Sequence, residues 1–246
     1  MEDQVRRLTE KVWGKFQSIP PSERFLVAVS GIPGSGKTTL AATVVKRLNA
    51  IQFSLSNKSS LPPIAGFVPM DGYHLTRAQL DAMPDPKHAH DRRGAAFTFD
   101  GESFLALVKK IREPITPDSK TLYAPSFDHA VKDPKENDIP IEPTSRILIF
   151  EGNYLSLDKE PWKTAAGMMD ELWFVEVDFE TAKDRLVPRH VKAGIAANEE
   201  EAEKRVKEND LVNGEEIVGN RMGVHEVVVS RDDKAWAPEA QGGVEK

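Results

Sequence analysis

Residues 31–38 read GIPGSGKT and directly follow the apolar run FLVAV at residues 25–29. The segment matches the pattern G-x-x-x-x-G-K-[ST] at every fixed position, and this pattern describes a loop that wraps around phosphate groups. Its glycines allow the chain to bend tightly and bring backbone N–H groups close to phosphate oxygens. An apolar strand before the loop and a helix after it complete the order that the motif requires, so we expect a nucleoside triphosphate to bind here.

Individual residues of this phosphate-binding loop have distinct expected contacts. Lys37 can reach the β- and γ-phosphates, and the hydroxyl group of Thr38 can ligate Mg²⁺. A glycine-rich turn without a ligand is the alternative interpretation, and the order of strand, loop and helix argues against it. The expected nucleotide contacts are Gly31, Ile32, Pro33, Gly34, Ser35, Gly36, Lys37, Thr38 and Thr39.

The composition indicates a soluble, globular chain of 246 residues, which is long enough for one α/β domain with a buried core. No run approaches the roughly 18 apolar residues that a membrane span needs, and the N-terminus has no apolar secretory signal. The absence of cysteine excludes disulfides and thiol catalysis and suits a cytoplasmic location. The net charge of −6 argues against a broad nucleic-acid-binding surface. We therefore expect neither a membrane nor a nucleic acid as partner.

Apolar runs alternate with helical patterns along the chain. Because the runs are continuously apolar, we predict a mainly parallel five-stranded sheet with helices on both faces, which is a three-layer αβα sandwich. The predicted strands cover residues 24–30, 64–70, 146–150, 171–177 and 224–230, and a helix over residues 37–48 precedes a loop insertion at residues 50–63. The single domain, residues 1–246, is predicted to contain an N-terminal helix (1–21), long site loops (84–146), a lid and following helix (179–212) and a frayed tail (231–246).

Carboxylates follow two of the predicted strands, at the edge of the sheet where parallel α/β proteins bind their ligands. Asp71 follows the second strand in MDGYH, and Glu151 follows the third in FEGNY. Asp71 is placed to accept the proton of an attacking hydroxyl group, whereas Glu151 could hold Mg²⁺ through a water or orient that hydroxyl group. A helix N-cap or a turn aspartate is the alternative interpretation for Asp71, and an ion pair is the alternative for Glu151.

Asp178 follows the fourth strand and can cap a helix that extends to residue 191 with an interruption at Pro188, and this helix carries two arginines. Arg185 and Arg189 are four residues apart, so both can face the same phosphate from one side of a helix. A lid helix that carries them would neutralise the transferring phosphoryl group and exclude water, whereas a solvated charged helix is the alternative. Arg92, Arg93 and His129 lie in the long loops as further candidates, with plain solvated surface as their alternative. The six histidines show no zinc-ligand spacing.

The segments GIPGSGKTTL, PMDGYHL, RRGAAFTFD, YAPSFDHAVKDP, IFEGNYLSLD and DRLVPRHVKAGI occur in this order. Together they resemble the P-loop small-molecule kinases of the uridine kinase, phosphoribulokinase and bacterial-type pantothenate kinase family. The resemblance is greatest to a fungal and bacterial branch that includes proteins labelled fructose transport system kinases. It extends over residues 25–229 and implies a P-loop NTPase fold, ATP and Mg²⁺ as cofactors, and a small hydroxyl compound as phosphate acceptor.

The resemblance also implies residue roles. Asp71 is the implied general base and Lys37 the contact to the transferring phosphate, while Thr38 and Glu151 organise Mg²⁺ and Arg185 and Arg189 belong to the lid. Asp71, Tyr73, His74, Arg92, Arg93, His129 and Glu151 fall where family members contact the acceptor. The DGYH segment departs from the usual uridine kinase pattern, and the acceptor-site stretch of pantothenate kinases is absent. A nucleoside, a pantothenate-like vitamin and a sugar therefore all stay open as acceptor.

The leading hypothesis is an ATP-dependent phosphotransferase that acts on such a small metabolite. An NTPase switch is one alternative, against which stands the absence of a guanine-reading Asn-Lys-x-Asp motif. A nucleotide-binding regulatory protein without catalysis is the other, and the intact Lys37, Asp71 and Glu151 argue against it. The oligomeric state stays open, because the N-terminal helix can pack on its own domain or against a second copy of the chain.

Overall fold

The computed structural model describes residues 1–56, 61–128, 130–231 and 236. Within these residues, the central element is a five-stranded sheet with the order β2-β5-β1-β6-β7, in which every neighbouring pair is parallel. Its strands are β1 (Phe25–Gly31), β2 (Ala65–Pro69), β5 (Ile147–Glu151), β6 (Glu171–Glu176) and β7 (Glu226–Val229). The predicted parallel five-stranded sheet is confirmed.

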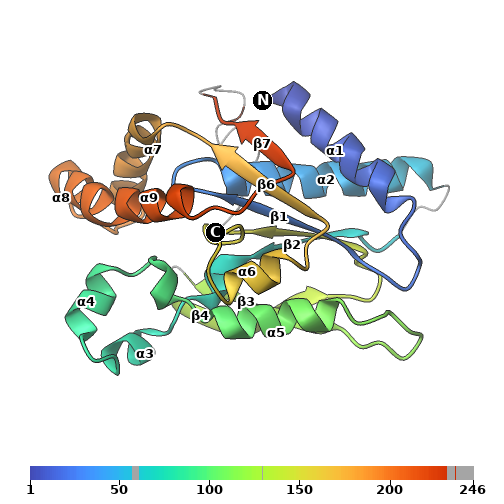
Figure 1. The fold of residues 1–246 in the computed structure, drawn as a ribbon, viewed down its shortest axis with the longest axis horizontal. Helices are drawn as coiled ribbons and strands as arrows, with labels where there is room; N and C mark the ends of the chain where they lie inside the picture. The colour runs from blue at the N-terminus through green and yellow to red at the C-terminus, as the bar shows by residue number, and fades with distance from the viewer. Residues whose placement is uncertain (57–60, 129, 232–235, 237–246) are drawn as a thin grey trace.

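Helices cover both faces of the sheet because successive strand residues point to opposite sides and both sides are apolar. In β1, Leu26 and Ala28 belong to one buried layer, whereas Val27 and Val29 belong to the other. The helices α1 (Glu2–Phe16) and α2 (Lys37–Leu55) cover one face, and α5 (Gly101–Ile111) and α6 (Trp162–Ala166) cover the other, as Figure 1 shows. The sequence prediction of a three-layer sandwich is therefore correct.

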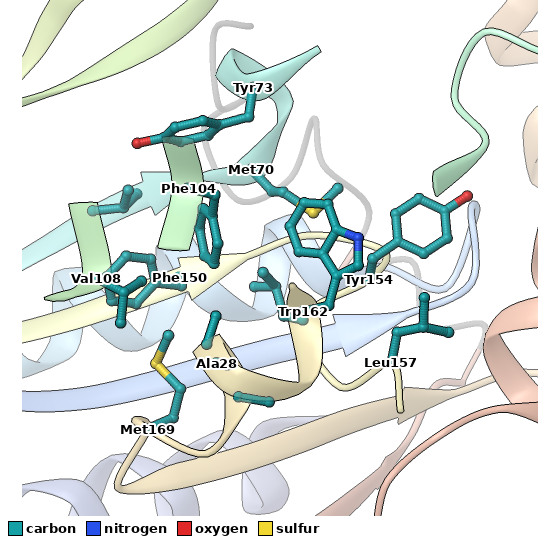
Figure 2. Close-up of a cluster of buried hydrophobic side chains, with 14 of the residues drawn as sticks. Ala28, Met70, Tyr73, Phe104, Val108, Phe150, Tyr154, Leu157, Trp162 and Met169 are labelled. Atoms are coloured by element: carbon teal, nitrogen blue, oxygen red, sulfur yellow. The ribbon is translucent and has the colours of Figure 1, made fainter. Parts of the chain in front are cut away.

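The core beneath α5 is rich in aromatic side chains. Phe104 packs edge-on against Phe150 of β5, with ring centroids 5.8 Å apart, and lies 5.5 Å from the ring of Trp162. Tyr154 packs on the other side of Trp162, at 6.1 Å. Figure 2 shows these rings together with Met70, so this layer reaches from the centre of the sheet to the segments that follow β2 and β5.

The N-terminal helix packs on its own domain. Val5, Leu8 and Val12 are fully buried against residues of α2 and the sheet. Helix α1 ends at Phe16 rather than at residue 21. None of the described helices has the length and apolar character that a membrane span requires.

The remaining described elements lie near the carboxyl edge of the sheet or in segments that lead to and from that edge. They are η1 (Met70–Tyr73), α3 (Arg77–Asp81), α4 (Pro86–Asp91), η2 (Ala96–Thr98), β3 (Leu122–Asp128), β4 (Asp133–Ile141), α7 (Phe179–Lys192), α8 (Glu199–Arg205), the π-helical turn η3 (Val206–Asp210) and α9 (Leu211–Gly219). Strands β3 and β4 form a separate antiparallel hairpin.

Several predicted loops are ordered elements. Helix α2 continues to Leu55 instead of ending at residue 48, so the first part of the predicted insertion at residues 50–63 is helical; residues 57–60 lie outside the described part. Residues 113–146, predicted to be loop with one possible strand near residues 121–123, contain the β3–β4 hairpin, and its first strand overlaps that position. Pro125 falls between Ala124 and Ser126, where the hairpin register shifts, and such irregular positions tolerate a residue without an N–H group.

Two further differences concern the lid region. Pro188 lies inside α7 without ending it, although we predicted an interruption there. The helix expected to end near residue 212 continues through η3 into α9 and ends at Gly219. Of the predicted frayed tail, only residues 231 and 236 lie within the described part of the chain.

Candidate active site at the phosphate-binding loop

The phosphate-binding loop joins the end of β1 to the start of α2. Gly36 caps α2 with φ 89°, in the left-handed region that glycine adopts without strain. Gly34 has φ +79°, and a Cβ there would lie 2.8 Å from the carbonyl oxygen of Ala182 in α7. The buried hydroxyl of Ser35 has no hydrogen-bond partner among the described residues. An unpartnered hydroxyl group beside a helix N-terminus fits the predicted binding of phosphate oxygens.

Lys37 and Glu151 face each other in this loop. The Lys37 Nζ lies 3.6 Å from Glu151 Oε1, and both side chains are largely buried. Their proximity follows from the sheet, in which Glu151 at the end of β5 lies opposite Val29 of β1. The ion pair that we considered as the alternative for Glu151 is present, and it places the carboxylate beside the phosphate-binding lysine.

The oxygen donors near this pair suit Mg²⁺. Thr38, in the first turn of α2, supplies a hydroxyl group, and Glu151 supplies a carboxylate. The described residues include no cluster of three His, Asp or Glu side chains that could hold a metal ion. In phosphoryl transfer Mg²⁺ is usually held by one or two protein oxygens together with water and substrate phosphates, and Thr38 and Glu151 could supply such oxygens.

Asp71 lies at the same edge of the sheet as Glu151. Strand β2 pairs with β5 so that Pro69 is opposite Glu151, and Asp71 follows two residues later in η1. The N-cap of η1 is Pro69, so Asp71 does not cap this turn but lies within it, as the turn-aspartate alternative expects. The main-chain carbonyl of Asp71 lies 2.8 Å from the His74 Nδ1, a contact that holds the turn in place.

Tyr73 and His74, the last two residues of the DGYH segment, differ in the exposure of their side chains. Tyr73 is 5% exposed and packs edge-on against Phe104, and burial raises the pKa of its hydroxyl group well above the ordinary value. The structure thus places Tyr73 in the core, with little surface for a substrate (Figure 2). His74 is half-buried, and its ring lies 4.0 Å from Phe99 and 4.9 Å from Phe127.

Helix α7 attaches to the phosphate-binding loop through Arg185. Its Nη1 donates to the carbonyl oxygen of Gly34 at 3.1 Å and to the Ser230 Oγ at 2.9 Å. Arg189, one turn further along α7, is exposed. Asp178 caps the helix as predicted, since its carboxylate accepts a hydrogen bond from the Thr181 N–H group. The arginine helix therefore packs directly on the loop.

Arg92 and Arg93 have different surroundings. Arg92 donates to the Oδ1 atoms of Asn209 and Asn213, at 3.1 and 2.7 Å. Arg93 donates to the carbonyl oxygens of Lys132 and Leu75 and forms an ion pair with Asp133 at 3.1 Å. The Arg93 guanidinium is thus engaged in holding the β3–β4 hairpin to the turn at residues 92–94. His129 lies outside the described residues.

The structure also brings in residues that the sequence analysis missed. Ser230 comes directly after β7, at the edge of the sheet where β5 ends in Glu151 and β2 leads to Asp71, so its position was a usable signal. Asn209 and Asn213 are buried. In the sequence, only their separation by four residues could have marked them as candidates for a site. Buried His190 contacts Asp210 at 2.9 Å and thereby joins α7 to the π turn.

The similar proteins and the solved structure described below are all named as kinases or kinase-like proteins. No family model matches the chain. It is 57% identical over 159 residues to an ATP-dependent kinase-like protein of Aspergillus versicolor, covering 65% of this chain and 92% of the relative. It is 42% identical over 191 residues to a Schizosaccharomyces pombe protein named provisionally as a uridine kinase, covering 78% of this chain and 77% of the relative.

Among solved structures, a bacterial protein of a Silicibacter species superposes with a TM-score of 0.76 and 31% sequence identity. It is named provisionally as a fructose transport system kinase. The match covers 91% of this chain and 98% of the bacterial one, so the similarity extends well beyond the phosphate-binding loop.

Proposed function

The chain belongs to the P-loop small-molecule kinases related to uridine kinase and is an ATP-dependent kinase, and on this premise we propose which residues transfer the phosphoryl group and to what. The proposed reaction moves the γ-phosphate of Mg-ATP to a hydroxyl group of a small metabolite in the cytoplasm. The parallel register carries the proposal, because it aligns Val29, Glu151 and Pro69 across β1, β5 and β2. Asp71 and Lys37 therefore lie at one edge of the sheet.

In the proposed mechanism Asp71 orients the acceptor hydroxyl group and accepts its proton as the oxygen attacks the γ-phosphorus, and the bond from that phosphorus to the bridging oxygen breaks and releases ADP. The Lys37 ammonium group and the Arg185 guanidinium stabilise the negative charge of the transferring group. Thr38 and Glu151 would hold Mg²⁺, which when bound neutralises phosphate charge. Helix α7 also covers the loop and excludes water, which favours transfer over hydrolysis.

A phosphotransfer screen tests this function. Mg-ATP is offered with nucleosides, pantothenate-like vitamins and sugars, and product is measured together with ATP hydrolysis in the absence of any acceptor. Because a positioned general base typically contributes about 10²- to 10⁴-fold, Asp71→Asn should lower kcat by that factor while the Kd for an ATP analogue changes by less than about threefold.

The exposed loop residue Asp118 supplies the control, since Asp118→Asn changes the same charge away from the site. Near-normal turnover by the Asp71→Asn protein would show that another group is the base. ATP hydrolysis at the same rate with and without every acceptor would favour the NTPase alternative instead.

A further inference from the structure

Two arginines near the candidate active site carry charges that no ion pair neutralises within the described part of the chain. Arg92 is half-buried and is held by the neutral amide oxygens of Asn209 and Asn213. Arg205 is also half-buried, and within the described residues its guanidinium donates to the carbonyl oxygen of Arg93 at 3.4 Å. The neighbouring Arg93, by contrast, has Asp133 as its carboxylate partner.

The carboxylate of Asp91 lies near Arg205, but within the described residues it forms its ion pair with Lys87. Asp91 lies close enough to Arg205 for the guanidinium to help lower its pKa, but the largest cause is its hydrogen bond to Lys87, at 2.6 Å. The Nε–H group of Arg205 is buried and has no hydrogen-bond partner among the residues that the structure describes. A half-buried guanidinium with an unused donor is costly unless a ligand satisfies it.

The position of these arginines links them to the reaction site. Asn213, which holds Arg92, precedes Gly214, and a Cβ on Gly214 would lie 3.4 Å from Ile32 of the phosphate-binding loop. On the other side, Arg93 donates to the carbonyl oxygen of Leu75, four residues beyond Asp71. The turn at residues 92–94 therefore lies between the phosphate-binding loop and the segment that carries the proposed base.

The helix geometry around Arg205 supports a functional role. Arg205 ends α8, and the π turn η3 follows at once. This turn directs Asn209 toward the Arg93 carbonyl, at 3.0 Å, so that Asn209 and Arg205 approach the same atom. Single π turns inside helices occur frequently at functional sites.

We propose that Arg92 and Arg205 bind an anionic group of the acceptor, a carboxylate or a phosphate. The acceptor is then a hydroxyl compound that carries negative charge, rather than a neutral nucleoside or sugar. This inference rests on the proposed phosphotransfer, because it names the class of compound that receives the phosphoryl group. Arginine suits the task, since its planar donors match the oxygens of both anions.

Inorganic phosphate serves as the probe for this anion site. Because phosphate also binds the phosphate-binding loop, the protein is first saturated with Mg²⁺ and a non-hydrolysable ATP analogue, and phosphate is then titrated calorimetrically. Arg205→Gln and Arg92→Gln should each weaken phosphate binding by about 10- to 100-fold, the range for a hydrogen bond to a charged group.

Three further proteins make the result interpretable. Arg205→Lys keeps the charge and should recover part of the affinity, which a purely structural role would not predict. Arg6→Gln removes the same charge from an exposed position of α1 and should bind phosphate like the parent. Circular dichroism confirms folding, and Arg205→Gln is the safer variant because it loses only one long hydrogen bond.

The same variants show whether the arginines bind an anionic group of the acceptor or a phosphate group of ATP. If the two glutamine variants weaken binding of the ATP analogue and leave phosphate binding unchanged, the arginines serve ATP and the proposal is overturned. Failure of the saturated parent protein to bind phosphate would overturn it as well.

Turnover of matched compounds completes the test, with a hydroxy acid against the corresponding polyol and a sugar phosphate against its parent sugar. The charged member of a pair should be preferred by the parent protein and lose that preference in Arg205→Gln. Equal turnover of both members in both proteins would overturn the anion site and leave the proposed function intact. Phosphate binding that depends on both arginines, with no transfer to any compound, would support the site and refute the phosphotransfer.

Discussion

The substitution Gly34→Ala measures how closely helix α7 packs on the phosphate-binding loop. Gly34 has φ +79°, and an added Cβ would lie 2.8 Å from the carbonyl oxygen of Ala182 and 3.2 Å from Leu186 Cγ. The left-handed conformation costs alanine about 1–2 kcal/mol. The clash adds about 1–3 kcal/mol, because a backbone carbonyl cannot rotate away and the helix must move. We therefore expect the free energy of unfolding to fall by about 2–5 kcal/mol.

Gly36→Ala is the matched control for this experiment. Gly36 has φ +89°, but the nearest described atom to its Cβ, beyond its chain neighbours, is Ser230 Oγ at 3.8 Å. It should lose only the backbone contribution, about 1–2 kcal/mol. Urea denaturation of the nucleotide-free proteins gives both values, and thermal melting gives a second reading, since 1 kcal/mol corresponds to about 2–4 °C for a chain of this length. Equal losses for the two variants would refute the close contact between the loop and α7.

The hydrogen bond to Arg7, with a further contribution from Lys11, lowers the pKa of Glu226 to about 2 from its ordinary value of 4.5. Since the folded pKa is the lower one, this stabilisation is complete above about pH 4.5 and is lost as the pH falls toward 2. Glu226→Gln should flatten the dependence of Tm on pH in that window, and an unchanged slope would contradict the assignment. Tyr154→Phe removes the 2.7 Å hydrogen bond to the carbonyl oxygen of Gly94. The unpaired carbonyl should lower the free energy of unfolding by about 1–3 kcal/mol in urea denaturation, and a loss within error would show that water replaces the hydroxyl group.

The sheet could be predicted because its strands are continuously apolar, and this is a local property. The third predicted strand, residues 146–150, corresponds to β5 at Ile147–Glu151. The β3–β4 hairpin could not be predicted in the same way. The sequence indicates only a possible strand near residues 121–123, where β3 begins. Strand β4 is largely polar and both strands contain proline, at Pro125 and Pro134, so the hairpin depends on pairing between the two strands.

The C-terminal end of α2 also could not be predicted from local sequence patterns. The helix continues through Ile51 and Phe53 to Leu55 although the segment after residue 50 reads as a polar connection. Asn49 of this helix exchanges hydrogen bonds with the main chain of Ala65 in β2, at 2.9 and 3.0 Å. Contacts of this kind with a neighbouring strand support the helix near its C-terminal end, and they lie beyond the reach of local patterns.

The sequence by itself determined the chemistry available to this protein. The glycine pattern at residues 31–38, and the carboxylates Asp71 and Glu151 after their strands, depend on local order and on the rule that parallel strands end at one edge. The tertiary structure alone decided which side chains meet there. Arg185 reaches Gly34 across 151 positions of the chain, and Arg92 reaches Asn213 across 121. Such contacts depend on how helices pack against the sheet, because packing brings together groups whose separation along the chain carries no signal of their proximity.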